Sequence, residues 1–171
     1  DKTHWREDKI GLVLRMQSQV HQQDPFPDFP AFLARAPVVA ELARLAGNEE
    51  KNEEHNPAVT ATADHAGAQA RWRELAPKLA SREVIASSAS REEFGWHLEW
   101  KGWLSGVPGA LRGAFVADGQ SSNWSVHRDH FSRLTPVLDL MHALSYSWKA
   151  AHSLGEPGLY DRWAGLIWRG P

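Results

Sequence analysis

The chain has 171 residues, 42% of them hydrophobic and 23% charged, a composition typical of a single soluble globular domain. It contains no cysteine, which excludes disulfides and thiolate metal sites and favours the reducing cytoplasm. The sequence opens with polar residues rather than with a signal-peptide pattern, and no apolar run approaches the ~18 residues of a membrane span. With 19 basic and 21 acidic residues the formal charge is −2, so the basic excess typical of a dedicated nucleic-acid module is missing.

The first part of the chain is predicted to hold one strand and a helical insertion. The apolar run over residues 10–16 predicts a buried strand. Two stretches with helical spacing of apolar residues follow, over residues 38–45 and 66–79. Between them, residues 48–58 are charged and poor in apolar side chains, so we expect them to be the most mobile internal segment. The flexible helical insertion or linker spans about residues 24–80.

The rest of the chain predicts alternating strands and helices. In order, the predicted elements are a strand over 82–87, a helix from Ser90 to 104, a strand over 113–117, a helix over 124–131, a strand over 135–138, a helix after Asp139 and a final helix carrying residues 160–167. Ser90 and Glu93 have the spacing of a capping box. This order indicates an α/β fold whose sheet has parallel members. Residues 116–117 and 137–138 are expected on adjacent or near-adjacent strands of one sheet, with the helix after Asp139 packed across it.

Asp118 is the strongest single candidate for chemistry. It follows an apolar strand and precedes Gly119. Ligands of open α/β sheets bind beyond the carboxyl ends of the strands, and a carboxylate there suits Mg²⁺, a cation that prefers oxygen ligands. The alternative is that the Asp-Gly pair is simply a turn.

Asp139 and His142 form the second candidate. Their spacing of three residues puts both on one face of the first helical turn, and Tyr146 and Lys149 continue that face. We expect Asp118 and His142 to share one polar cleft, because neighbouring parallel strands end at the same edge of a sheet. The alternative is that Asp139 is only a helix cap and His142 a partly buried residue.

A weaker cluster lies on the predicted helix over residues 124–131. His127 and His130 are three residues apart, with Arg128 and Arg133 beside them. Such a cluster suits contact with phosphate, or it is a solvated helix face.

Taken together, these features resemble a family of transposases. The runs that carry the resemblance are residues 115–120, 123–124, 130–131 and 136–146, with further similarity at residues 5–12, 24–25 and 160–164. They are similar to bacterial DDE insertion-sequence transposases of the Kra type, which are related to the Mutator-like transposases. The resemblance implies an α/β, RNase H-like mixed sheet with flanking helices. It implies that residues 1–171 are a partial catalytic domain, incomplete at both ends.

The resemblance also implies a chemistry. In that family three acidic residues hold two Mg²⁺ or Mn²⁺ ions that drive hydrolysis and strand transfer of DNA phosphodiesters. Asp118 matches the second acid, a metal ligand, while Asp139 and His142 match a D-x-x-H step; these three are the candidate catalytic residues. The first acid would precede Asp1 and the glutamate would follow Pro171, so this chain is expected to be inactive alone. The complete enzyme would bind the DNA of insertion-sequence ends, and self-association is a further expected interaction.

Two other functions remain open from the residues. The first is a non-catalytic interaction protein that retains the α/β scaffold, which the charged stretch 48–56 and the nine tryptophans would suit. The second is an unrelated hydrolase in which Asp118 is a nucleophile or metal ligand, although that reading requires a second reactive residue near Asp118.

Overall fold

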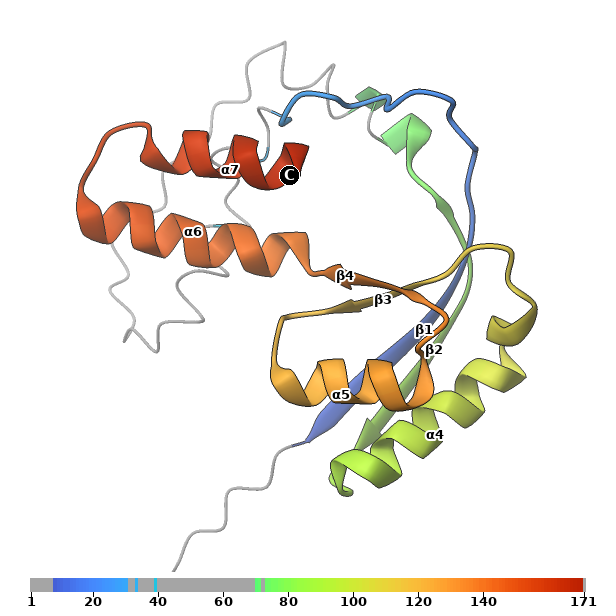
Figure 1. Cartoon of the computed structure of the whole chain (residues 1–171). Helices are drawn as coiled ribbons and strands as arrows, with labels where there is room; N and C mark the ends of the chain where they lie inside the picture. The colour runs from blue at the N-terminus through green and yellow to red at the C-terminus, as the bar shows by residue number, and fades with distance from the viewer. Residues whose placement is uncertain (1–7, 31–32, 34–38, 40–69, 72, 171) are drawn as a thin grey trace, which may run out of the picture. The chain divides into compact units, whose positions relative to one another are not determined.

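The structure is a computed structural model and describes residues 8–30, 33, 39, 70, 71 and 73–170. It is a mixed α/β structure, as the sequence predicts (Figure 1). The chain forms two compact units, which we call the sheet unit (Asp1–Ser18 with Pro77–Asp139) and the helical unit (Gln19–Ala76 with Leu140–Pro171). None of the described helices is long and apolar enough to cross a membrane. The predicted mobile segment, residues 48–58, lies outside the described residues.

The first sheet consists of two antiparallel strands, β1 (Lys9–Gln17) and β2 (Lys78–Ser87), paired with Leu12 opposite Val84. Successive side chains of a strand point to opposite faces. Val13 therefore packs into the core, while the neighbouring Leu12 is 55% exposed. The predicted burial of β1 is correct for one face and wrong for the other, because the described residues cover only one face.

The second sheet pairs β3 (Ala114–Ala117) with β4 (Thr135–Leu138) in parallel, with Val116 opposite Val137. Helix α5 (Ser121–His130) connects the two strands. The prediction that residues 116–117 and 137–138 lie on adjacent or near-adjacent strands of one sheet is confirmed, since the two strands pair directly. Val116 of β3 is 60% exposed.

One hydrophobic core holds the sheet unit together. Its buried members come from helix α4 (Arg91–Leu104), α5 and the turn that follows α5, and they are Phe94, Leu98, Val126 and Phe131. Val13, Ile85 and Phe115, from β1, β2 and β3, pack against them. The two sheets thus share a core but no backbone hydrogen bonds among the described strands. The expected single sheet is two two-stranded sheets in this part of the chain.

Helix α4 begins where the sequence predicts. The Ser90 hydroxyl accepts a hydrogen bond from the Glu93 amide, and the Glu93 side chain accepts one from the Ser90 amide, so the capping box is confirmed. The helix ends at Leu104 with Ser105 as its C-cap, and Gly106 follows with a φ of 83°, a conformation that favours glycine. A single 3-10 turn, η1 (Val107–Gly109), comes next.

The helical unit is built on two helices, α6 (Leu140–Leu154) and α7 (Leu159–Arg169). Its buried core consists of Val39, Leu144, Ala151, Leu159, Tyr160 and Ala164. The indole N–H of Trp168 donates to the carbonyl oxygen of Phe26 at 2.8 Å, which holds the proline-rich segment on α7.

The helix predicted over residues 66–79 extends too far. Residues 70, 71 and 73–75 are helical, and β2 begins at Lys78. Pro77 explains the difference, because proline disfavours a helical conformation for the residue before it and cannot donate a backbone hydrogen bond.

Candidate active site

The candidate site begins at the carboxyl end of β3, where the half-buried Asp118 follows Ala117. Its Oδ1 accepts hydrogen bonds from the Gln120 amide at 3.1 Å and from the Asn123 side-chain amide at 2.8 Å. Gly119 has a φ of 93°, and a Cβ there would lie 3.3 Å from the Leu138 side chain. Asp118 is therefore fixed in a tight turn that leads into α5.

The hydrogen bonds of this turn involve only one of the two oxygen atoms of the Asp118 carboxylate. Within the described part of the chain, both hydrogen bonds to this group use Oδ1. The turn interpretation and the ligand interpretation of Asp118 are therefore compatible, because each uses a different oxygen atom.

Asp139 joins Asp118 at this edge. The parallel register places Ala117 opposite Leu138, so the next residues, Asp118 and Asp139, both follow at the carboxyl end of the sheet. The Asp139 amide donates to the Ala117 carbonyl oxygen at 2.7 Å, which extends the pairing to the point where the two aspartates leave the strands. Two residues with carboxylate side chains, Asp118 and Asp139, thus follow their strands at the same edge of the sheet.

His142 lies in the first turn of α6, on the other side of the boundary between the two units. Its ring contacts that of Tyr146, with 4.9 Å between the ring centroids, and its carbonyl oxygen accepts a hydrogen bond from the Ser145 hydroxyl. Asp118 and Asp139 belong to the sheet unit and His142 to the helical unit. The shared cleft of Asp118 and His142, and the packing of α6 across the sheet, stay predictions.

The donor atoms at the edge suit Mg²⁺ or Mn²⁺ in kind, since both ions favour carboxylate oxygens. They are too few for a two-metal centre, which needs several converging carboxylates. Among the described residues, no group of three or more histidine, aspartate or glutamate side chains is placed to hold a metal ion. Asp118 and Asp139 can supply part of a metal site, and other carboxylates would have to complete it.

The histidines of α5 have structural partners. The Nε2 atom of His127 lies 2.9 Å from the Leu134 carbonyl oxygen. The side chain of His130 is only 8% exposed, and its Nδ1 lies 2.7 Å from Oε2 of Glu99 on α4. These contacts join α5 to its neighbours, so they favour a packing role for both histidines over contact with phosphate.

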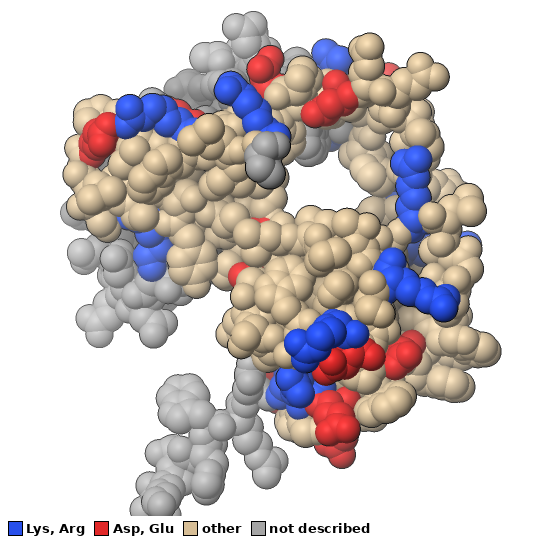
Figure 2. Space-filling view, in the orientation of Figure 1, with Lys and Arg blue, Asp and Glu red and all other residues tan. Residues whose placement is uncertain are grey.

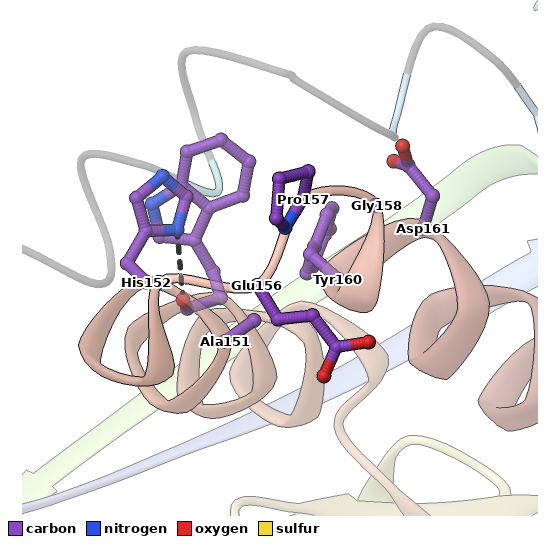
Figure 3. Close-up of a pocket in the computed structure, with 9 residues that line it drawn as sticks. Ala151, His152, Glu156, Pro157, Gly158, Tyr160 and Asp161 are labelled. Carbon is purple, nitrogen blue, oxygen red and sulfur yellow. Dashed lines mark hydrogen bonds between the residues drawn. The ribbon is translucent and has the colours of Figure 1, made fainter.

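A pocket of about 340 Å³ lies at the turn between α6 and α7, within the helical unit (Figure 3). The residues that line it are Trp148, Ala151, His152, Gly155, Glu156, Pro157, Gly158, Tyr160 and Asp161. The Glu156 carboxylate pairs with Arg162, and in Figure 3 the carboxylates of Glu156 and Asp161 point away from His152. The buried Tyr160 hydroxyl donates to the Leu33 carbonyl oxygen at 3.4 Å. The polar groups of this pocket do not converge on a common point.

Burial raises the pKa of Tyr160 to about 12, and the Asp161 carboxylate adds to the effect. Tyr160 is therefore protonated at neutral pH and serves as a hydrogen-bond donor.

Sequence reasoning assigned no role to Gln120 and Asn123, which orient Asp118. The signal was present, because both polar residues follow an Asp-Gly pair at the start of a helix. An aspartate often accepts from the backbone amide two residues on, but the Asn123 contact depends on the direction in which α5 leaves the turn.

A comparison of the chain with family models, with curated proteins and with solved structures finds no match. The similarity to Kra-type transposases rests on the sequence runs given above and stays a prediction.

Proposed function

We propose that the chain is part of the RNase H-like catalytic domain of a DNA transposase, and that Asp118 is one of its metal ligands. The observation that carries the proposal is the parallel pairing of β3 and β4, which brings Asp118 and Asp139 to one sheet edge. Loops at the carboxyl ends of parallel strands are the usual position of ligand sites in α/β proteins.

Unpaired strand edges and an exposed sheet face support the proposal that the chain is only part of a catalytic domain. Neither β1 nor β3 has a second partner strand among the described residues. The family resemblance implies an additional strand that carries the first acid, and such a strand could pair with one of these edges. The uncovered face of β1 exposes Ile10, Leu12, Leu14 and Met16, at 45–69%. A helix that carries the third acid could cover this face.

In the proposed reaction, two divalent ions would activate the attacking oxygen and stabilise the leaving oxygen of a DNA phosphodiester. Asp118 would bind metal through Oδ2 while Gln120 and Asn123 hold Oδ1. Asp139 adds negative charge at the same edge. His142 would orient a phosphate or the attacking group. The net charge of −2 implies that DNA is bound mainly by other segments of the transposase.

Titration of the chain with Mn²⁺ by calorimetry tests this proposal. We expect weak binding that is about tenfold weaker in Asp118→Asn, because the substitution removes the ligand charge and keeps the shape of the side chain. The matched control is Asp129→Asn, since Asp129 is on the same unit but pairs with Arg128; it should bind like the wild type. Equal binding by the wild type and Asp118→Asn would refute the assignment. In a complete transposase, Asp118→Asn should abolish DNA cleavage.

A non-catalytic interaction protein is the second candidate function. Exposed aromatic side chains favour it, because Trp96, Trp100 and Trp103 of α4 are each at least 60% exposed. The same titration separates the two candidates, since an interaction protein has no need for Asp118 to bind Mn²⁺.

A further inference from the structure

The outer side of α4 presents a ridge of large apolar side chains, which we call the tryptophan ridge. It consists of Trp96, Trp100, Trp103 and Leu104, which are 60, 63, 61 and 59% exposed. Their spacing is that of one stripe along a helix. The opposite side of α4 is buried in the core of the sheet unit, so the direction of the ridge is fixed by packing.

The ridge is already ordered on the protein surface. The rings of Trp100 and Trp103 are stacked, with centroids 5.8 Å apart and an angle of 8° between the planes. A contiguous exposed apolar patch is uncommon on a monomeric protein and marks a site of interaction. Tryptophan is also the residue type most enriched among the energetic centres of protein interfaces.

Two charged residues beside the ridge have ion-pair partners. Of the charged residues beside it, Glu99 lies 2.7 Å from His130, and Lys101 lies 3.0 Å from Glu83. Both have a partner within their own chain, so an apolar surface can cover these two side chains without burying an unpaired ion.

The surroundings do not resemble a nucleic-acid platform. Figure 2 shows acidic and basic side chains lying side by side over the α4 and α5 end of the sheet unit, without a field of one sign. Aromatic platforms for single-stranded nucleic acid combine stacking residues with a basic groove. The ridge therefore fits a protein surface better.

We propose that the tryptophan ridge is the contact between two copies of this chain, with α4 of one copy packed antiparallel on α4 of the other. The ridge is self-complementary about Trp100, because Trp96 lies four residues before it and Leu104 four residues after it. A two-fold axis near Trp100 places Trp96 of each copy opposite Leu104 of the other, as an isologous interface requires.

The available area is sufficient for such a contact. A tryptophan buries up to about 250 Å², so three that are some 60% exposed offer roughly 450 Å² per copy. Two copies would bury roughly 900 Å² from the tryptophans alone, and Leu104 with the surrounding rim brings the total near the ~1,200 Å² of the smaller stable interfaces.

Sedimentation equilibrium over a range of concentrations tests the proposal. We expect a monomer–dimer equilibrium whose dissociation constant rises at least about 30-fold in Trp100→Asp, as for a central interface residue. The matched control is Leu111→Asp, which places the same charge at a fully exposed leucine of the sheet unit and should dimerise like the wild type. Circular dichroism should show that both variants keep the wild-type fold.

Labelling with 5-fluorotryptophan provides a second measurement, with resonances assigned by Trp→Phe variants. In the dimer, the signals of Trp96, Trp100 and Trp103 should be shielded from a soluble paramagnetic agent, and they should become accessible on dilution. A chain that is monomeric at every concentration overturns the proposal, whether the ridge is accessible or is shielded by the same chain. A dimer that Trp100→Asp leaves intact also overturns it, because the contact is then elsewhere.

Discussion

Asp118 combines a structural and a chemical assignment in one side chain. Its Oδ1 holds the turn between β3 and α5 through Gln120 and Asn123, and this accounts for its position without any ligand. The proposed metal contact uses the second oxygen. Asp118→Ala removes both the hydrogen-bond acceptor and the metal ligand, whereas Asp118→Asn removes only the negative charge. The two variants should therefore behave differently.

Replacing Asp118 by alanine should lower the free energy of unfolding by about 1–3 kcal/mol, because two hydrogen-bond donors lose their acceptor. Asp118→Asn should cost well under that amount, since the amide oxygen can accept the same two bonds. Chemical denaturation of the two variants measures both values. Equal losses of stability would mean that the charge of Asp118, rather than its hydrogen bonds, stabilises the turn.

The raised pKa of Tyr160 predicts that the folded protein loses stability in alkaline solution. Its pKa is about 12 in the folded protein and about 10 in the unfolded chain, so folding disfavours the ionised form. The stabilisation is fully present below pH 10 and is lost as the pH rises towards 12, by at most about 2–3 kcal/mol. Denaturation curves between pH 9 and 12 should show this loss in the wild type and in the control Tyr146→Phe. A loss of the same size in Tyr160→Phe would contradict the assignment.

At the scale of elements, the sequence predicts those helix and strand boundaries that are determined by residues close together in the chain. The capping box at Ser90 and the strand β4 are found where their local patterns place them. Helix α5 begins at Ser121, three residues before the prediction, because its N-cap residue Gln120 makes no capping bond through its side chain and so leaves no such signal. The sharing of one core by two sheets depends on contacts between distant residues, which no local pattern encodes.

Two glycines of α4 should respond oppositely to alanine. A Cβ at Gly95 would collide with the His130 ring, which is buried and paired with Glu99, so Gly95→Ala should destabilise the protein by about 1–3 kcal/mol. A Cβ at Gly102 would meet Phe131 and Val107 at ordinary contact distances, 3.4 Å or more. Gly102→Ala should therefore be neutral or stabilising by up to about 1 kcal/mol. Thermal unfolding compares the two, and a stable Gly95→Ala variant would contradict the packing of α4 on α5.

At the scale of the whole molecule, the chain has two cores built from interleaved segments. Residues Leu140–Pro171 belong with Gln19–Ala76, while the sequence between these two segments, Pro77–Asp139, belongs to the sheet unit. The sequence predicted a helix after Asp139, but the helical pattern does not say which segment packs on its apolar face. The sequence therefore predicted that β3 and β4 belong to one sheet, which brings Asp118 and Asp139 to one edge. It could not predict that a unit boundary falls between Asp139 and His142.

Separate cores predict separate responses to a core substitution. Leu144 is fully buried in the helical unit, so Leu144→Ala should cost about 2–5 kcal/mol there. Hydrogen exchange should show faster exchange in α6 and α7, with little change in the amides that pair β1 with β2. Equal loss of protection in both units would mean that they unfold as one.

We propose that Asp118 and Asp139 form part of a metal-binding edge of the sheet unit, and the predicted cleft would add His142 to it. Paramagnetic broadening by Mn²⁺ in amide NMR spectra measures it directly, because only residues near the bound ion lose signal. We predict selective broadening at Gly119, Leu138 and Leu140, extending to His142 and greatly reduced in Asp118→Asn. Broadening that is absent from this edge, or that is unchanged in Asp118→Asn, would contradict the metal assignment. Broadening at Gly119 but not at His142 would contradict the shared cleft.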